Sequence, residues 1–328
     1  MTWLITGGAG FIGAHVVRTM LAAGERVAVY DDLSTGDPAR VPDHVPFVKG
    51  SVLDPELLRR TMSDLGVSGV VHLAAKKQVG ESVERPLHYY RENVEGLRVL
   101  LEAAADTGVQ HFLFSSSAAV YGMPDVNLVT EETPCSPVNP YGETKLAGEW
   151  LVRAAGRSHG MTTACLRYFN VAGAADELLA DAGVFNLVPM VFEKLTQGGA
   201  PVIFGDDYDT ADGTCVRDFI HVEDIASAHL AAARALTTRE PGSDLTVNIG
   251  RGEGVSVREM IELIGDVTGY GDRAAPVSAP RRAGDPARVV ASADRIRAEL
   301  GWTARHDVQA MVRSAWDGWC RRHPEARR

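Results

Sequence analysis

Cysteine and lysine are scarce in this chain, and neither is arranged as a cofactor-binding cluster. The four cysteines, Cys135, Cys165, Cys215 and Cys320, lie far apart, with no CxxC pair and no histidine at metal-ligand spacing. This pattern excludes the common cysteine-based zinc and redox motifs, so we expect reduced thiols and no metal site. Lysine occurs only at Lys49, Lys76, Lys77, Lys145 and Lys194.

The sequence also lacks a long apolar run and an excess of positive charge. No stretch approaches the roughly 18 apolar residues that a membrane span requires, and residues 1–6 are too short for the apolar part of a signal peptide. The net charge of −10 argues against a nucleic-acid or anionic-membrane surface, although clustered arginines could still bind phosphates. We therefore expect a cytoplasmic protein that binds neither nucleic acid nor membrane.

The first half of the chain alternates short apolar runs with amphipathic stretches. The 328 residues are 45% hydrophobic and 23% charged, which is typical of a globular protein with a sizeable core. Strand–helix alternation with continuous apolar strands predicts a doubly wound (Rossmann) α/β domain with a parallel sheet. The expected strands are residues 3–6, 27–30, 45–48, 69–73 and 111–115, and the expected helices are 11–23, 55–65 and 89–107.

After about Asn170 the pattern loosens, and Gly, Pro and Asp become frequent. We expect a first domain over residues 1–172, with a return segment near 216–236. A second, smaller α/β domain would span residues 173–328. Its expected helices are residues 187–196, 222–235, 256–268 and 308–322, and its isolated strands are 202–204 and 245–249.

A glycine-rich loop stands between the first strand and the first helix. Gly7, Gly10 and Gly13 allow a tight turn and a close approach of the backbone to a pyrophosphate, which the helix N-terminus attracts. Asp31 ends the next strand, where it could accept hydrogen bonds from a ribose 2′-hydroxyl. Asp31 and Asp32 together would repel a 2′-phosphate, so the pattern favours NAD over NADP. The alternative is a glycine-rich turn with surface acids.

Tyr141 and Lys145 form a Tyr-x-x-x-Lys motif just after Pro140, which suits the first turn of a helix. Residues four apart lie on one helical face, so the ammonium could lower the pKa of the phenol and make it a base near neutral pH. Residues 115–117, all serine, end a strand where ligands bind in open α/β folds. The alternative for these serines is a strand end that caps a turn.

With these motifs the sequence resembles the extended short-chain dehydrogenase/reductase superfamily and, within it, the UDP-glucose (UDP-galactose) 4-epimerases. The similarity runs along essentially the whole chain. It is carried by residues 6–13, 79–83, 115–117, 141 with 145, 167–170, 203–208, 212–214, 216–222 and 279–285. The segments around residues 205–218 and 280–285 are much more specific to the epimerases than the others.

The resemblance implies roles for individual residues. Ser117, Tyr141 and Lys145 would be catalytic, with the first two meeting the 4-hydroxyl of the sugar. The residues that would contact NAD are Gly7, Gly10, Phe11, Ile12, Gly13, Asp31, Ser51, Val52, Leu73, Ala74, Ala75, Lys77, Asn93, Tyr141, Lys145 and Tyr168. Those that would contact the UDP-hexose are Lys77, Ser117, Tyr141, Asn170, Asn186, Leu187, Val202, Phe204, Arg217, Phe219, Arg282, Asp285 and Val289.

The sequence departs from the family pattern at four positions. Ser51 stands where an aspartate usually contacts the adenine, Phe219 where tyrosine is common, and Phe185 where asparagine is common. Val289 occupies a position where a bulky tyrosine narrows the sugar pocket in some members. A smaller side chain there predicts a wider range of sugars, such as N-acetylhexosamines.

The implied activity is interconversion of UDP-galactose and UDP-glucose, by oxidation at C4 with NAD, rotation of the 4-keto sugar and re-reduction. Relatives form homodimers through the helices after Tyr89 and Tyr141. A 4,6-dehydratase is disfavoured because Ala118 and Ala119 stand where that family carries an Asp-Glu pair. The alternatives left open are a 4-epimerase of UDP-N-acetylhexosamine or UDP-glucuronate, and a non-catalytic NAD-binding regulator.

Overall fold

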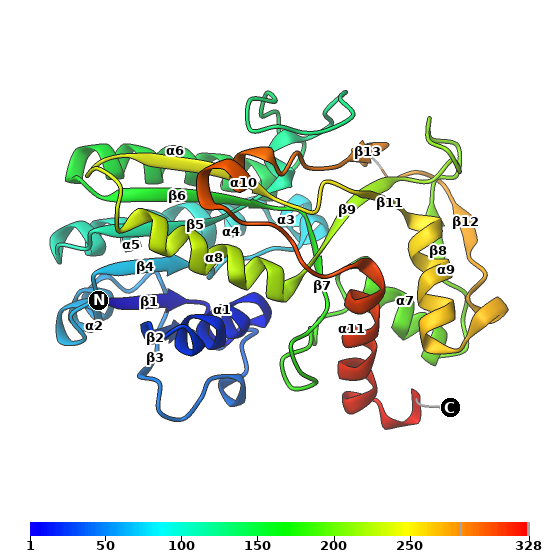
Figure 1. The fold of residues 1–328 in the computed structure, drawn as a ribbon, viewed down its shortest axis with the longest axis horizontal. Coiled ribbons are helices and arrows are strands. Elements are labelled where there is room, and N and C mark those ends of the chain that lie inside the picture. Colours follow the sequence, from blue (N-terminus) through cyan, green and yellow to red (C-terminus); the bar gives the residue numbers. More distant parts are fainter. Residues whose placement is uncertain (283, 327–328) are drawn as a thin grey trace.

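A parallel sheet of seven strands forms the larger part of the molecule in the computed structural model, which describes residues 1–282 and 284–326 (Figure 1). The strands lie in the order β10, β6, β5, β4, β1, β2, β3. Their bounds are β1 Thr2–Thr6, β2 Arg26–Asp31, β3 Phe47–Lys49, β4 Gly69–His72, β5 His111–Ser117, β6 Thr162–Tyr168 and β10 Asp244–Ile249. The predicted doubly wound fold is confirmed.

Helices cover both faces of this sheet because its strands bury side chains on both sides. Along β1, Trp3 and Ile5 join the core on one face, whereas Leu4 joins the core on the other. One face carries α1 (Phe11–Ala22), α8 (Val222–Leu236) and α10 (Asp294–Leu300). The other carries α2 (Pro55–Asp64), α5 (Gly96–Asp106) and α6 (Pro140–His159).

The smaller region lies beyond the carboxyl ends of these strands, at the right of Figure 1. It contains α7 (Leu187–Thr196), α9 (Val257–Thr268) and α11 (Val308–Arg322), which share a core in which the ring centroids of Phe192 and Trp316 lie 5.0 Å apart. A four-stranded sheet and a strand pair complete it. They are formed by β7 (Asn170–Ala172), β9 (Val216–His221), β11 (Gly254–Ser256) and β13 (Arg288–Val289), and by β8 (Val202–Phe204) with β12 (Val277–Ala279).

Several predicted elements differ from the observed ones in their bounds or in the sheet that they join. The third strand starts at Phe47, not at residue 45, because Pro46 has no N–H to donate to a neighbouring strand. The helix predicted at 89–107 is preceded by α3 (Val79–Glu84), begins as α4 (Pro86–Tyr89) and passes through a π-helical turn before α5. The strand predicted as isolated at 245–249 is β10, which pairs with β6 in the large sheet. The division into two domains at residue 172 stays a prediction.

The strand order places a switch point between β1 and β4, because β1 lies between β2 and β4. In open α/β sheets ligands bind outside the carboxyl ends of the strands at such a point. The glycine loop follows β1 and residues 73–75 follow β4, so both reach this crevice.

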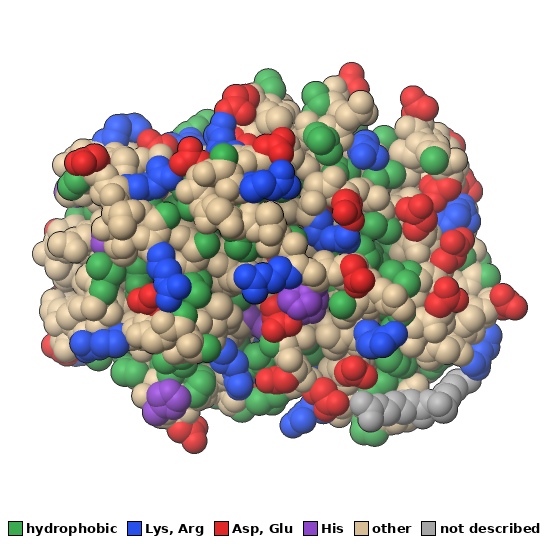
Figure 2. All heavy atoms as spheres, in the orientation of Figure 1, with side chains coloured by type: hydrophobic (Ala, Val, Ile, Leu, Met, Phe, Trp, Pro, Cys, Tyr) green, Lys and Arg blue, Asp and Glu red, His purple; other side chains and the backbone are tan. Residues whose placement is uncertain are grey.

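Charge on the surface is mixed. In the face drawn in Figure 2, basic side chains lie among acidic ones, and acidic side chains gather over the end that carries α9 and β12. Among the described residues, none of the helices combines the length and apolar character needed to cross a membrane.

Candidate active site

The glycine loop between β1 and α1 has no room for side chains. Gly7 has a φ of +72°, and a Cβ there would lie 2.7 Å from the backbone nitrogen of Ala74. A Cβ on Gly13 would lie 2.0 Å from the carbonyl oxygen of Gly7. Gly10, at the N-cap of α1, offers no side chain to the first turn of the helix, so a ligand can meet its N–H groups. The loop therefore fits a pyrophosphate.

Asp31, at the end of β2, is held in place by the backbone. Its two carboxylate oxygens accept hydrogen bonds from the N–H groups of Ala9, at 2.9 Å, and Leu33, at 2.8 Å. Burial raises the pKa of this carboxyl, and these two hydrogen bonds oppose that rise. Each oxygen keeps a further lone pair, so Asp31 can accept a ribose hydroxyl as predicted.

These groups border a cleft of about 380 Å³ along the carboxyl ends of the strands. Fourteen of the sixteen residues predicted to contact NAD line it. They are Gly7, Gly10, Phe11, Ile12, Gly13, Asp31, Val52, Leu73, Ala74, Ala75, Lys77, Tyr141, Lys145 and Tyr168. Its volume lies within the roughly 300–1,000 Å³ that is typical of ligand sites, and its glycine loop and Asp31 offer the groups that a dinucleotide would bind.

The other two predicted cofactor residues, Ser51 and Asn93, are not among the residues that line this cleft. The hydroxyl of Ser51 accepts from the N–H of Leu53 at 3.2 Å. The amide of Asn93 accepts from the N–H of Lys76 at 2.8 Å and donates to its carbonyl at 2.9 Å. Asn93 therefore holds the segment after β4 that lines the cleft.

Tyr141 and Lys145 point from the first turns of α6 toward the end of β5. The amide oxygen of Asn139 caps this helix by accepting from the N–H of Gly142 at 2.9 Å. The Lys145 ammonium donates to the carbonyl of Ser115 at 2.7 Å and lies 5.9 Å from the centre of the Tyr141 ring. Ser117, at the end of β5, is within hydrogen-bonding reach of the Tyr141 phenol.

Burial shifts the pKa values of this pair in opposite directions. It lowers the pKa of Lys145 to about 7. It raises the pKa of Tyr141, and the hydrogen bond with Ser117 only partly offsets that rise. The direction for Tyr141 is opposite to the one predicted from the Tyr-x-x-x-Lys spacing, because desolvation disfavours the phenolate. Positive charge added to the cleft would favour the phenolate and so oppose this rise.

Glu149 is a buried residue of this site that the sequence reasoning missed. Its carboxylate accepts from the Ser116 hydroxyl at 2.6 Å and from two nitrogens of Arg167, at 2.8 and 2.7 Å. Glu149 thereby ties α6 to β5 and β6, and this fixes the position of Tyr141 and Lys145 relative to the ends of these strands. The signal was its spacing, one turn beyond Lys145 on the same helical face.

A second cleft, of about 370 Å³, lies between α7, β8, β9 and the segment before β13. Nine of the residues predicted to contact the UDP-hexose line it. They are Asn170, Asn186, Leu187, Val202, Phe204, Arg217, Phe219, Arg282 and Asp285. Phe185 lines this cleft and also the cofactor cleft, so the two share a wall.

Two guanidinium groups dominate the chemistry of the second cleft. Arg217 pairs with the carboxylate of Asp285 and donates to the carbonyl of Val216 at 2.9 Å. Arg282 stacks on the ring of Phe204, with its guanidinium carbon 3.7 Å from the ring centre. Planar guanidinium groups make paired, charge-assisted hydrogen bonds to phosphates, so this cleft suits a nucleoside diphosphate.

The remaining predicted substrate residues lie outside the second cleft. Lys77 and Tyr141 line the cofactor cleft, and Ser117 lies beside Tyr141. Val289 is 8% exposed and packs in a small core cluster with Tyr121 and Phe169.

One group of potential metal ligands, His221, Glu223 and His306, has its ligand atoms within 4.8 Å of one another. These residues line neither of the two clefts. Both ring nitrogens of His221 are engaged, one with the N–H of Glu223 at 3.1 Å and the other with the Ser314 hydroxyl at 3.0 Å. Burial also lowers the pKa of His221 to about 3. These contacts favour a structural role for the group.

Comparison with known proteins yields concordant matches. The profile of the NAD dependent epimerase/dehydratase family matches residues 3–250. A UDP-glucose 4-epimerase of Azospirillum brasilense is 44% identical over 317 residues, covering 95% of this chain and 90% of that protein.

Solved structures agree with this match. A UDP-glucose 4-epimerase from Stenotrophomonas maltophila, with bound NAD and formylated UDP-arabinopyranose, superposes with a TM-score of 0.92 at 37% identity and covers 99% of each chain. The UDP-Glc/GlcNAc 4-epimerase of Campylobacter jejuni superposes with a TM-score of 0.84, also at 37% identity, and covers 97% of this chain and 98% of that one.

Proposed function

Because the chain belongs to the NAD dependent epimerase/dehydratase family, we propose that it is an NAD-dependent UDP-glucose 4-epimerase, which interconverts UDP-galactose and UDP-glucose. The observation that carries this proposal is the junction of two clefts. One is a dinucleotide cleft that contains Tyr141 and Lys145, and the other is a cleft with two arginines suited to a diphosphate. This arrangement brings a sugar linked to the diphosphate toward the phenol.

The reaction is redox-neutral, so the cofactor is not consumed. Bound NAD would supply reversible hydride transfer at C4 of the sugar, and its nicotinamide ring would add positive charge to the cleft. Gly7, Gly10, Gly13 and Asp31 would hold this cofactor, as their geometry allows.

Tyr141 is the residue we assign to the proton of the C4 hydroxyl. Tyr141 is partly buried, and its phenol hydrogen-bonds with Ser117, which would orient it and hydrogen-bond to the same hydroxyl. Lys145 lies on the same helix face, and its ammonium is fixed by the Ser115 carbonyl. The added positive charge in the loaded site would lower the pKa of Tyr141, which burial alone raises. Tyr141 would then act as base in one direction and as acid in the other.

The second cleft would hold the UDP firmly and the hexose loosely. Arg217 and Arg282 would bind the diphosphate, and Asn186 and Phe204 would border the nucleotide. A hexose that is tethered only through its diphosphate can turn its other face toward the cofactor without leaving the protein. Strong anchoring of UDP with weak anchoring of the sugar is therefore suited to epimerisation.

A turnover assay tests this function directly. The purified protein is incubated with UDP-galactose, UDP-glucose, their N-acetyl analogues and UDP-glucuronate, without added NAD and then with it. We expect UDP-galactose and UDP-glucose to reach one equilibrium mixture from either side. Absence of any interconversion, with NAD and UDP both bound, would instead favour a non-catalytic NAD-binding regulator.

We also propose that the enzyme accepts N-acetylhexosamines. Val289 is smaller than the tyrosine of some family members, and the Campylobacter jejuni relative carries a UDP-Glc/GlcNAc designation. Because Val289 packs against Tyr121 and Phe169, it would act by shaping the wall behind the sugar. The ratio of kcat/KM for UDP-N-acetylgalactosamine and UDP-galactose measures this range. No turnover of the acetylated sugar would reject the proposal.

A homodimer is supported by an apolar patch that this chain leaves open. Val83, Leu87 and Trp150 are 62%, 83% and 60% exposed. They lie on α3, α4 and α6, which pack against one another, so they share one side of the molecule. Sedimentation velocity should show a dimer for the native chain and a monomer for Leu87→Asp with Trp150→Glu. A native monomer at micromolar concentration would contradict the proposal.

Two further assignments stay predictions. The first is the domain division, with residues 1–172 and a return segment near 216–236 forming the NAD-binding unit and residues 173–328 the nucleotide-sugar unit. The packing of α8 on α1 supports the return segment, and limited proteolysis would map the boundary. The second is a cytoplasmic location, which fractionation of the source cells would test.

A further inference from the structure

The wall shared by the two clefts is a short segment, residues 181–186. Asp181 and Gly183 line the cofactor cleft, Asn186 lines the nucleotide cleft, and Phe185 lines both. Phe185 is 56% exposed, so much of a large apolar ring is accessible to a ligand. Because this ring lines both clefts, a ligand in either cleft can contact it.

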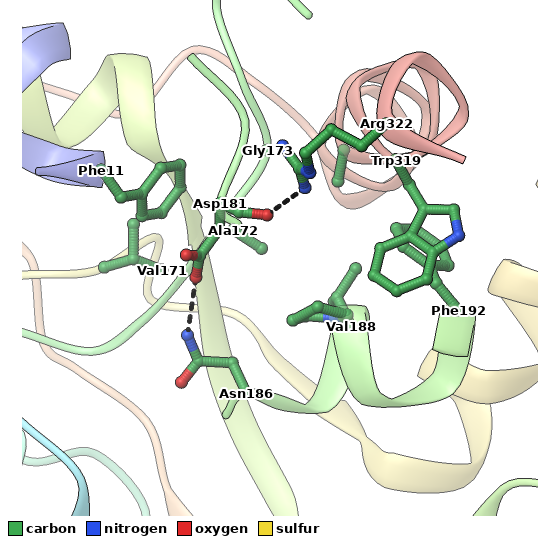
Figure 3. Close-up of a pocket in the computed structure, with 12 residues that line it drawn as sticks. Phe11, Val171, Ala172, Gly173, Asp181, Asn186, Val188, Phe192, Trp319 and Arg322 are labelled. Atoms are coloured by element: carbon green, nitrogen blue, oxygen red, sulfur yellow. Dashed lines mark hydrogen bonds between the residues drawn. The ribbon is translucent and has the colours of Figure 1, made fainter. Parts of the chain in front are cut away.

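The base of this segment is clamped from both regions of the molecule. Arg40, which lines the cofactor cleft, donates to the carbonyl of Ala180 at 2.8 Å. Arg322, from α11 of the smaller region, donates to the same carbonyl at 3.1 Å and also to the carbonyl of Asp181. Figure 3 shows Arg322 reaching Asp181 from the side opposite Asn186. The base of the segment is therefore held from both regions, and these contacts do not extend to Phe185.

Within the segment, one side chain links the two clefts directly. The Asp181 carboxylate accepts from the amide of Asn186 at 3.3 Å (Figure 3) and from the N–H of Gly183 at 3.1 Å. A Cβ on Gly183 would lie 2.8 Å from the ring of Phe185, so the ring lies close over this glycine. Rearrangement on one side of the segment must therefore move groups on the other.

We propose that residues 181–186 couple the two clefts, with the Phe185 ring as the shared contact, so that a dinucleotide in one and a nucleoside diphosphate in the other each strengthen the binding of the other. Either ligand covers one side of the ring and orders the segment. The second ligand then meets an ordered wall and loses less conformational entropy on binding. Such coupling is reciprocal.

This inference rests on the proposed function, in which coupling between the clefts would keep the sugar and the cofactor bound at the same time. During epimerisation the oxidised sugar and the reduced cofactor must stay together until hydride returns. If the diphosphate holds the wall closed over the cofactor, neither partner leaves first. Loss of coupling would therefore release the keto sugar and leave reduced cofactor on the enzyme.

The test measures UDP binding by titration calorimetry, to protein stripped of nucleotide and to protein saturated with NAD. For the native chain we expect NAD to tighten UDP binding at least about fivefold, the lower end of typical coupling between sites. Phe185→Ser should reduce that factor to near one, and Phe185→Leu, which keeps part of the apolar area, should give an intermediate value. Because the ring is mostly exposed, these substitutions leave the core intact, and thermal unfolding of the variants would verify this.

Phe204→Leu provides the matched control. Phe204 lines the nucleotide cleft but not the cofactor cleft, so this change should weaken UDP binding equally with and without NAD. Native coupling near one, or a Phe185→Ser variant with native coupling, would overturn the inference while leaving the epimerase assignment standing. If the native chain binds no UDP, the proposed function and this inference both fall.

Discussion

The two clefts have nearly the same volume, about 380 and 370 Å³, but they are built in different ways. The cofactor cleft collects the ends of parallel strands from one sheet, and its polar groups are buried and held by the backbone, as at Asp31 and Lys145. The nucleotide cleft gathers side chains from separate segments, some of them exposed, such as Asn186 and Arg282, and others partly buried, such as Arg217. We infer that the cofactor cleft, with its buried groups, is the more rigid of the two, and that the nucleotide cleft, with its exposed arginine and asparagine, is the more adaptable.

The sharpest test of this contrast is removal of the phenol. Tyr141→Phe deletes the group assigned to the proton of C4, so we expect kcat to fall about 10²–10⁴-fold, the usual contribution of general acid–base catalysis. Binding of NAD and UDP, measured by calorimetry, should remain close to native because the ring and its packing are kept. Near-normal turnover would show that another group transfers the proton.

The glycine loop offers a test of the rigid cleft itself. In Gly13→Ala the new methyl would lie 2.0 Å from the Gly7 carbonyl, so the loop must shift. We expect a loss of stability of about 1–3 kcal/mol, typical of overpacking, together with weaker NAD binding. Thermal unfolding with and without NAD measures both effects. Gly80→Ala, whose methyl meets no atom within 4 Å, is the control that should change little.

In the adaptable cleft a comparable deletion should affect binding more than chemistry. Arg282→Ala removes a guanidinium from the nucleotide cleft and should raise KM for UDP-galactose roughly tenfold or more, since a charge-assisted hydrogen bond contributes about 1.5–3 kcal/mol. We expect kcat to stay within a small factor of native. Arg281→Ala is the control, because Arg281 pairs with Asp207 and is not among the residues that line the cleft. A fall in kcat with unchanged KM would show that Arg282 serves the chemistry and not the binding of the nucleotide.

The smallest expected effect concerns the buried ammonium and pH. Burial lowers the pKa of Lys145 from 10.5 to about 7, so the unfolded chain binds more protons than the folded chain between these values. The native protein is therefore penalised below pH 7, and the penalty fades as the pH rises toward 10.5. Lys145→Met should raise Tm by about 2–4 °C near pH 7, with a smaller gain near pH 10. The exposed Lys49→Met is the control, and a pH-independent difference would contradict the assigned desolvation.

Much of the fold could be predicted because the apolar periodicity of this chain is strong. The helices predicted at 187–196 and 308–322 have those bounds in the structure, since their patterns are local. The start of α9 is equally local, because Ser256 and Glu259 form a capping box. The placement of β10 beside β6 was not predicted, because pairing between strands so far apart in sequence leaves no local signal.

The residues of the candidate site also fall into those that local sequence patterns predict and those that depend on tertiary contacts. The glycine loop and Asp31 could be found because their chemistry depends on spacing within one strand–turn–helix unit. Glu149 escaped notice because its partners, Ser116 and Arg167, come from two different strands. Phe185 was recognised only as a departure from the family pattern, and its position between two clefts depends on the arrangement of both regions.

By itself the sequence determined which groups are present and which share a helix face or a turn, because backbone geometry sets those relations over a few residues. It thereby specified the dinucleotide loop, the Tyr141–Lys145 pair and the family of the protein. The direction in which the pKa of each member of that pair shifts depends on tertiary packing, because desolvation comes from side chains that folding brings together from distant segments. For the same reason, only the folded chain shows that one aromatic ring borders both binding sites.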